Sequence, residues 1–99
     1  MELARETVDT TTGSLVLEFG AEWCGICAAA QPIIESALAA HPGLRHVKVE
    51  DGRGKRLGRT FGIKLWPTLV ILHDGREIAR VVRPRSRAEI ESALAQLPK

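Results

Sequence analysis

The alternation of apolar and polar residues predicts strands and a helix in the first half of the chain. Residues 15–19 are a nearly continuous apolar run, which is typical of a short strand covered on both faces. Residues 28–40 carry apolar side chains at helical spacing, and the Pro-Gly pair that follows ends this helix. At residues 45–50 the pattern alternates, which predicts a strand with Val47 and Val49 facing the core.

The second half of the chain predicts a hairpin followed by a helix. Residues 68–72 are a further buried strand, Asp74-Gly75 is a two-residue hairpin turn, and residues 77–82 form the returning strand. Ser86 and Glu89 have the spacing of a capping box, which marks the start of the last helix.

Two segments are less clearly patterned. Residues 1–14 are predicted to be weakly structured, with a short edge strand at residues 5–8, and residues 55–60 have room for one short helix. A strand–helix–strand crossover gives parallel pairing and the hairpin adds antiparallel strands, so the sheet should be mixed. The pattern predicts a single α/β domain over residues 1–99, with helices on both faces of one sheet.

Composition and charge narrow the classes of function. The chain has 99 residues, of which 44% are hydrophobic and 26% charged, as in ordinary globular proteins. No apolar run approaches the roughly 18–20 residues that span a bilayer, and the first residues lack the pattern of an export signal. We therefore expect no membrane partner and a cytoplasmic location, unless the chain is the mature part of an exported protein. Basic residues within 53–59 and 80–87 are not interleaved with aromatics, so we interpret them as solvated surface and expect no nucleic-acid partner.

The two cysteines are the strongest chemical signal. Cys24 and Cys27 are three positions apart, directly after a predicted strand and at the start of a helix. Free N–H groups and the helix dipole favour an anion there, so the pKa of Cys24 should be lowered and its thiolate should be the nucleophile. Cys27, one turn further on the same face, is placed to resolve the mixed disulfide. As a structural bridge the pair would close almost no loop.

A C-x-x-C pair has two other interpretations. It is often half of a zinc site, but the remaining ligands would have to be His41, His46, His73 or carboxylates, none of which has paired spacing. The second alternative is a pair of inert core cysteines. The strand before the pair and the helix after it favour redox chemistry, for which we expect no metal and no bound cofactor.

At these residues the chain resembles the thioredoxin family. The resemblance rests on Glu22-Trp23-Cys24-Gly25-Ile26-Cys27, on Pro32 and on Trp66-Pro67-Thr68, together with the hairpin and the closing helix, and it covers roughly residues 15–97. It implies a thioredoxin fold, with a central mixed sheet of four to five strands flanked by helices. The region before residue 15 departs from the family, because it is short and is expected to lack the helix that usually precedes the central strand.

The same resemblance implies roles for individual residues. Trp23 would shield the nucleophile, and Pro67 is similar to the family's cis-proline, whose loop faces the cysteines and binds substrate. Glu18 is the polar outlier of its strand and is similar to the buried acid that exchanges a proton with Cys27. Lys48 corresponds to the lysine that accompanies this acid. A purely structural Glu18–Lys48 ion pair is the alternative.

Three positions depart from the family pattern. Ile26 replaces the proline of W-C-G-P-C, and the dipeptide between the cysteines helps set the relative stability of dithiol and disulfide. Arg83 stands where the family has a small glycine in the substrate groove, and Trp66 replaces a smaller aliphatic residue. The residues expected to contact substrate are Trp23, Gly25, Ile26, Trp66, Pro67 and Arg83.

Together these features predict a thiol–disulfide oxidoreductase that reduces protein disulfides in the cytosol as a monomer. A flavin-dependent, thioredoxin-reductase-like enzyme or another dithiol would restore its cysteines. One alternative is an adaptor or assembly chaperone that holds a single partner through the Trp66/Arg83 surface. The other is a disulfide isomerase or oxidase, which Glu18 and Ile26 favour but which needs an oxidising compartment.

Overall fold

The four strands form one mixed sheet, as the sequence predicts. The computed structural model describes residues 3–98, so residues 1, 2 and 99 of the predicted domain lie outside the described residues. In chain order the elements are α1 (Arg5–Asp9), β1 (Ser14–Gly20), α2 (Gly25–Ala39), β2 (Arg45–Glu50), α3 (Arg56–Thr60), β3 (Thr68–His73), β4 (Arg76–Val82) and α4 (Arg87–Leu94). The strand order is β2-β1-β3-β4. The β1–β2 pair is parallel, and the β1–β3 and β3–β4 pairs are antiparallel.

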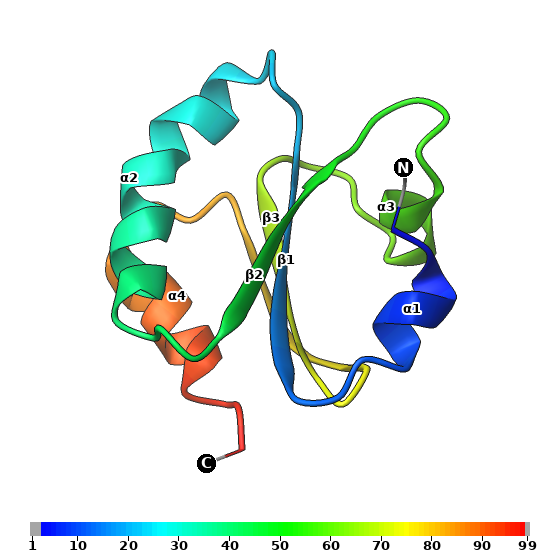
Figure 1. The fold of residues 1–99 in the computed structure, drawn as a ribbon. Coiled ribbons are helices and arrows are strands. Elements are labelled where there is room, and N and C mark those ends of the chain that lie inside the picture. The colour runs from blue at the N-terminus through cyan, green and yellow to red at the C-terminus, as the bar shows by residue number, and fades with distance from the viewer. Residues whose placement is uncertain (1–2, 99) are drawn as a thin grey trace.

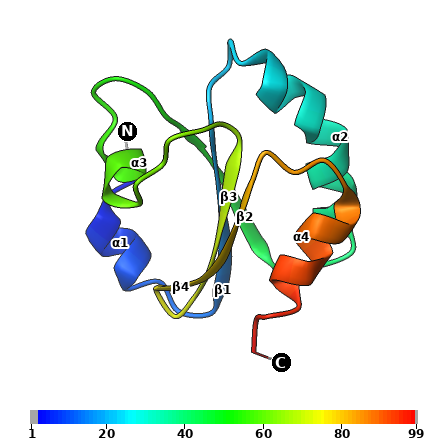
Figure 2. The ribbon, with the colours of Figure 1, turned by 180° about the vertical axis from the view of Figure 1, so that it is seen from behind.

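Helices cover both faces of this sheet. Helices α2 and α4 lie on one face, and α1 and α3 lie on the other (Figure 1). The view from behind shows the same two layers with their sides exchanged (Figure 2). The loop from β1 to α2 lies at the end of the sheet where β1 stops, so whatever follows β1 is placed at that edge.

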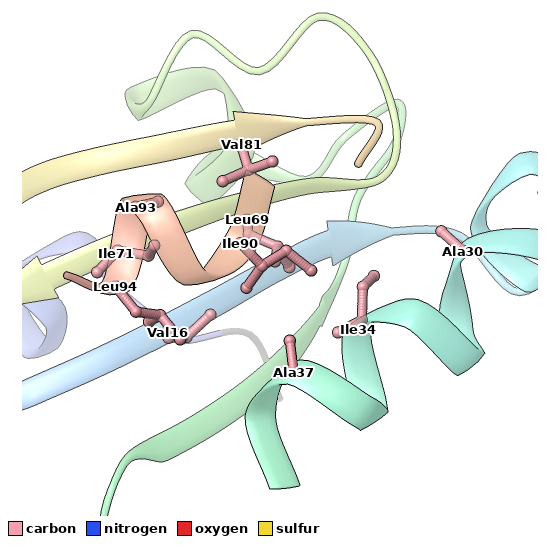
Figure 3. Close-up of a cluster of buried hydrophobic side chains, with 10 residues drawn as sticks. All are labelled: Val16, Ala30, Ile34, Ala37, Leu69, Ile71, Val81, Ile90, Ala93 and Leu94. Carbon is pink, nitrogen blue, oxygen red and sulfur yellow. The ribbon is translucent and has the colours of Figure 1, made fainter. Parts of the chain in front are cut away.

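Two apolar clusters fill the space between sheet and helices. The cluster under α2 and α4 is drawn in Figure 3 and comprises Val16, Ala30, Ile34, Ala37, Leu69, Ile71, Val81, Ile90, Ala93 and Leu94. The cluster on the opposite face comprises Val8, Leu15, Leu17, Phe19, Leu57, Phe61, Val70 and Leu72. Successive apolar residues of β1 and β3 alternate between the two clusters, which explains why both strands are largely apolar, with Glu18 as the charged exception.

The N-terminal segment corrects one prediction. Residues 5–8 were predicted to be an edge strand, and the helix before the central strand to be lacking, yet Arg5–Asp9 forms the helix α1. Its Val8 is fully buried in the second cluster. The Arg5 guanidinium lies 3.8 Å from the centroid of the Phe61 ring and donates a hydrogen bond of 2.8 Å to the Thr60 carbonyl. A five-residue helix has little stability of its own, so these contacts with a distant segment hold it in place.

Strand β2 corrects a second prediction. Val47 was predicted to face the core but is 38% exposed, whereas Val49 is half-buried against the second cluster. The cause is the strand order, because β2 lies at the edge of the sheet and has a neighbour on one side only.

The predicted turn and cap are confirmed. Asp74 and Gly75 both have positive φ, of 50° and 79°, as a tight two-residue hairpin requires. At the start of α4 the Ser86 side chain accepts the N–H of Glu89, and the Glu89 carboxylate accepts the N–H of Ser86. Both signals are local in sequence, which is why they could be recognised there.

Candidate active site

The two cysteines lie at the junction of β1 and α2. Strand β1 ends at Gly20, and Cys24 is the N-cap of α2, so Cys27 falls in the first helical turn. The Cys27 backbone N–H donates a hydrogen bond of 3.1 Å to the Cys24 sulfur. Both residues are free thiols, with Cys24 half-buried and Cys27 7% exposed. The predicted position of Cys24 at the start of the helix is confirmed, and the helix begins three residues before the apolar pattern of residues 28–40.

The pKa values of the two thiols are shifted in opposite directions. Burial acts to raise the pKa of Cys24, but hydrogen bonds from Cys27 and from the Ile26 backbone, together with the positive charge of Arg83, lower it overall. For Cys27, burial raises the pKa to about 11, with further contributions from Cys24 and from the charge of Glu18. Cys24 is therefore the thiol that ionises at the lower pH.

Glu18 is a buried carboxylate with two side-chain partners. It is 5% exposed. His46 Nε2 lies 2.7 Å from Glu18 Oε1, and Gln31 Nε2 donates a hydrogen bond of 2.5 Å to Oε2. Burial acts to raise the pKa of Glu18, but the bonds to His46 and Gln31 and the positive charges of His46 and Lys48 lower it overall. Glu18 is consequently ionised at neutral pH.

The Glu18–Lys48 ion pair that the sequence leaves open is not formed. In the β1–β2 register Glu18 is opposite Lys48 and Val16 is opposite His46, yet the ion pair of Glu18 is with His46. A long side chain reaches its diagonal neighbour on the same face of a sheet, and this is what Glu18 does. Lys48 is exposed, and it acts on Glu18 only through its charge.

A cleft of about 290 Å³ opens beside Cys27, between β1, β2 and α2. Its lining includes both cysteines, Glu18, Gln31 and Lys48. Gly20 also lines it, and a Cβ added at Gly20 would lie 3.0 Å from the Cys27 sulfur. Glycine at this position therefore lets the thiol pack closely against the end of β1. The cleft brings the acid, the thiol and solvent into one place.

The residues predicted to contact substrate come together from three segments. Trp23 is 77% exposed, and its ring meets the edge of Trp66 with centroids 5.3 Å apart. The Trp66-Pro67 peptide is cis. Arg83 Nε donates a hydrogen bond of 2.8 Å to the Trp66 carbonyl, and the Arg83 backbone N–H donates one of 2.8 Å to the Pro67 carbonyl.

Arg83 and the first turn of α2 complete this surface. Arg83 has φ of 49°, in the left-handed region that favours glycine, and its charge acts on Cys24. Gly25 is exposed and Ile26 is 47% exposed. The result is an exposed apolar surface beside the low-pKa thiol, with one guanidinium at its edge.

Three residues of the site have roles that were not predicted from the sequence. His46 and Gln31 hold Glu18, and Asp51 accepts a hydrogen bond of 2.8 Å from Trp66 Nε1. Two signals were available, because Gln31 follows Cys27 by four residues on one helix face and His46 precedes Lys48 by two on one strand face. Asp51 lies just beyond β2 and has no comparable signal.

The structure also bears on metal and membrane sites. Among residues 3–98, no three His, Cys, Asp or Glu side chains cluster in a way that could hold a metal ion. Over the same part of the chain, no helix has the length and apolar character needed to cross a membrane.

Comparison with known proteins decides the family. Residues 4–96 match the family model described as Thioredoxin. The chain belongs to the thioredoxin family. Thioredoxin from Chlamydia pneumoniae is 35% identical over 71 residues, which is 72% of this chain and 70% of the relative.

Solved thioredoxin structures agree with this assignment. Thioredoxin 2 from Pseudomonas aeruginosa PAO1, in its reduced form, has a TM-score of 0.84 and 52% identity, covering 93% of this chain and 85% of that one. Mitochondrial thioredoxin 3 from Saccharomyces cerevisiae, in its oxidized form, has a TM-score of 0.76 and 26% identity, covering 94% of this chain and 86% of that one. The thioredoxin fold predicted from the sequence is confirmed. The chain is a thioredoxin-type thiol–disulfide oxidoreductase with a C-x-x-C pair, and thus a protein-disulfide reductase.

Proposed function

We propose that this thioredoxin-family chain is a cytoplasmic reductant of protein disulfides in which Cys24 attacks and Cys27 resolves. The observation that carries the proposal is the hydrogen bond of 3.1 Å from the Cys27 N–H to the Cys24 sulfur, beside a Cys27 thiol that is itself buried, an arrangement that shifts the two pKa values in opposite directions. An attacking thiol has to be ionised at working pH, whereas a resolving thiol has to stay protonated until the mixed disulfide has formed.

The reaction transfers two electrons from the dithiol to the substrate disulfide. The Cys24 thiolate attacks one substrate sulfur, the substrate S–S bond breaks, and the other substrate sulfur leaves as a thiolate that takes a proton from water. Cys27 then gives its proton to Glu18, either directly or through water in the cleft, and its sulfur attacks Cys24 Sγ. The Cys24–Cys27 disulfide forms as the bond to substrate breaks, and the second substrate sulfur leaves as a thiolate that takes a proton from water.

Substrate would bind on the surface around Cys24. The residues proposed to contact it are Trp23, Gly25, Ile26, Trp66, Pro67 and Arg83. The exposed Trp23 ring, the half-buried Trp66 ring and Ile26 supply apolar contact area, and Arg83 adds a positive charge that acts on the reacting sulfur. An extended protein segment that presents a disulfide fits such a surface better than a small polar molecule does.

The remaining parts of the proposal concern the chain's partners. A flavin-dependent, thioredoxin-reductase-like enzyme or another dithiol returns the Cys24–Cys27 disulfide to the dithiol. The chain works as a single monomeric domain, because every group named above comes from one copy of it. Lys48 contributes its charge to the cleft in which Glu18 accepts the proton.

Reduction of insulin disulfides by the dithiothreitol-supported chain tests the assignment of roles. Cys24→Ser should abolish turnover, and Cys27→Ser should accumulate a covalent mixed disulfide that is visible by mass spectrometry and is released by excess dithiothreitol. The double serine variant is the matched control, because it keeps the surface but forms no covalent adduct. Insulin reduction by Cys24→Ser at the wild-type rate would overturn the proposal.

The reduction potential of the cysteine pair separates a reductant from the isomerase or oxidase alternative. Thiol trapping across dithiothreitol and glutathione buffers should give a value near the −270 mV typical of thioredoxin. A value of about −180 mV or above is typical of isomerases and oxidants, and it would contradict both the direction of electron flow and the cytoplasmic location.

A further inference from the structure

The buried acid of this chain is held by a different side chain from the one that the sequence predicts. Of the two basic residues on β2 that share the face of Glu18, His46 makes the direct contact at 2.7 Å, and Lys48 acts only through its charge. Gln31 binds the other carboxylate oxygen. Both oxygens of Glu18 are thus oriented by named partners.

The charged and titratable groups around Glu18 come from two elements. From α2 it is faced by Cys27 and from β2 by His46 and Lys48, while its register partner on β3 is the apolar Leu69. The Glu18 charge disfavours the thiolate of Cys27, and the two residues that favour the ionised carboxylate from the sheet are both on β2. Of these, His46 has a side chain that is only 24% exposed and Lys48 is exposed, so the His46 contact is the less screened.

We propose that His46 is a positioning residue of the thiol–disulfide reaction: its imidazole holds and orients the Glu18 carboxylate that accepts the proton of Cys27. The proton passes from Cys27 Sγ to Glu18 while the S–S bond to Cys24 forms and the bond to substrate breaks. The departing substrate thiolate takes a proton from water, and His46 is neither oxidised nor reduced. The kinetic consequence rests on the proposed function, whereas the ionisation of Glu18 does not.

Loss of the His46 imidazole should raise the pKa of Glu18. Burial, which is the largest influence on the pKa of Glu18, acts to raise it, and the His46 hydrogen bond is the largest influence that lowers it. Without His46 the burial remains, so the pKa rises and Glu18 is protonated over a wider range of pH. A protonated Glu18 cannot accept the Cys27 proton, so the resolving step should slow as pH falls.

Three variants separate a positioning role from a general effect on the fold. His46→Leu removes the hydrogen bond to Glu18, His46→Gln keeps an N–H donor at this position, and Lys48→Met removes the lysine charge on β2. The ¹³C resonance of the Glu18 carboxyl, assigned with Glu18→Gln, reports its titration directly. Stopped-flow resolution of a mixed disulfide formed on Cys24 reports the kinetic effect across pH.

We expect His46→Leu to raise the midpoint of the Glu18 titration and to shift the acid limb of the resolution profile upward by the same amount. Below that midpoint the rate should fall about tenfold per pH unit, since only the ionised carboxylate accepts a proton. His46→Gln should recover part of the shift, and Lys48→Met should shift the midpoint less than His46→Leu. Attack of Cys24 on Ellman's reagent at neutral pH, which needs no base at Cys27, should change less than twofold in His46→Leu.

An unchanged Glu18 midpoint in His46→Leu would overturn the inference, as would a larger shift in Lys48→Met. Thermal unfolding followed by circular dichroism checks each variant, and if His46→Leu does not fold, the midpoint in His46→Gln decides instead. Failure of wild-type protein to reduce insulin would overturn the proposed function alone, because the carboxyl titration involves no substrate.

Discussion

The contrast between the two thiols predicts which one an electrophile modifies first. Iodoacetamide added to the reduced chain at pH 7 reacts with thiolates, so its rate at each cysteine follows the ionised fraction and the intrinsic reactivity of that thiolate. Cys24 has a lowered pKa and is half-buried, whereas Cys27 has a pKa of about 11 and is 7% exposed. We expect alkylation to occur at Cys24.

The size of the preference can be worked out from the Cys27 pKa. A pKa of about 11 lies about 2 units above the reference value of 9.0, so the thiolate fraction at pH 7 is smaller by about 100-fold. Reactivity per thiolate rises with pKa, with a Brønsted coefficient of about 0.4–0.5, so each Cys27 thiolate is more reactive by a factor of roughly 6–10. Cys27 should then react about 10- to 16-fold more slowly than an ordinary cysteine, and the lowered pKa of Cys24 widens the gap between the two.

The assay is a timed alkylation at pH 7, quenched with excess N-ethylmaleimide and followed by fragment-ion mass spectrometry, because no lysine or arginine separates the two cysteines. The single-serine variants provide separate rates for each thiol. In Cys24→Ser the contribution of Cys24 to the Cys27 shift is lost, but burial, the largest cause, remains. Equal labelling of the two thiols in wild type, or faster labelling of Cys27, would refute the assignment of the thiolate to Cys24.

Three further predictions concern the surroundings of the site. Arg83→Met removes a positive charge that lowers the pKa of Cys24, so the midpoint of the alkylation rate against pH should rise. Ser86→Ala removes the N-cap of α4, which should cost about 1 kcal/mol and lower the Tm by roughly 4–8 °C in thermal unfolding. The folded-state pKa of Glu18 is depressed, so its ionisation stabilises the fold above the unfolded pKa of about 4.3 and this contribution is lost as pH falls through the folded pKa. Urea unfolding of Glu18→Gln should therefore depend less on pH between about pH 5 and pH 2 than unfolding of wild type does.

Features that depend on residues close together in the chain could be predicted from the sequence. The capping box at Ser86 needs only its own first helical turn, and the hairpin at Asp74-Gly75 needs two residues with positive φ. The Cys24–Cys27 pair is likewise local, because the helix N-terminus supplies the hydrogen bonds that its sulfur accepts. In the capping box and at Cys24, the hydrogen-bond partner lies three positions away along the chain.

Features that depend on distant segments could not be predicted from the sequence. Helix α1 is held by Arg5, which hydrogen-bonds the Thr60 carbonyl and lies over the Phe61 ring. No pattern within residues 5–9 predicts these contacts. The exposure of Val47 follows from the position of β2 at the sheet edge, and an alternating pattern does not reveal strand order. Positions such as these require the packed structure, since their environment comes from chain segments that meet only on folding.

The contact between Glu18 and His46 follows from this edge position as well. Side chains of β2 on the α2 face lie between the buried β1 and solvent, so each polar group there can point either toward β1 or into water. A lysine ammonium is strongly hydrated and sits on a flexible four-carbon stem, which favours extension into water, and Lys48 is exposed. An imidazole is less strongly hydrated and is carried on a single carbon, so His46 stays against the carboxylate. The register places Lys48 directly opposite Glu18. A direct contact would require the Lys48 ammonium to lose its hydration, which is costly, so His46 makes the contact instead.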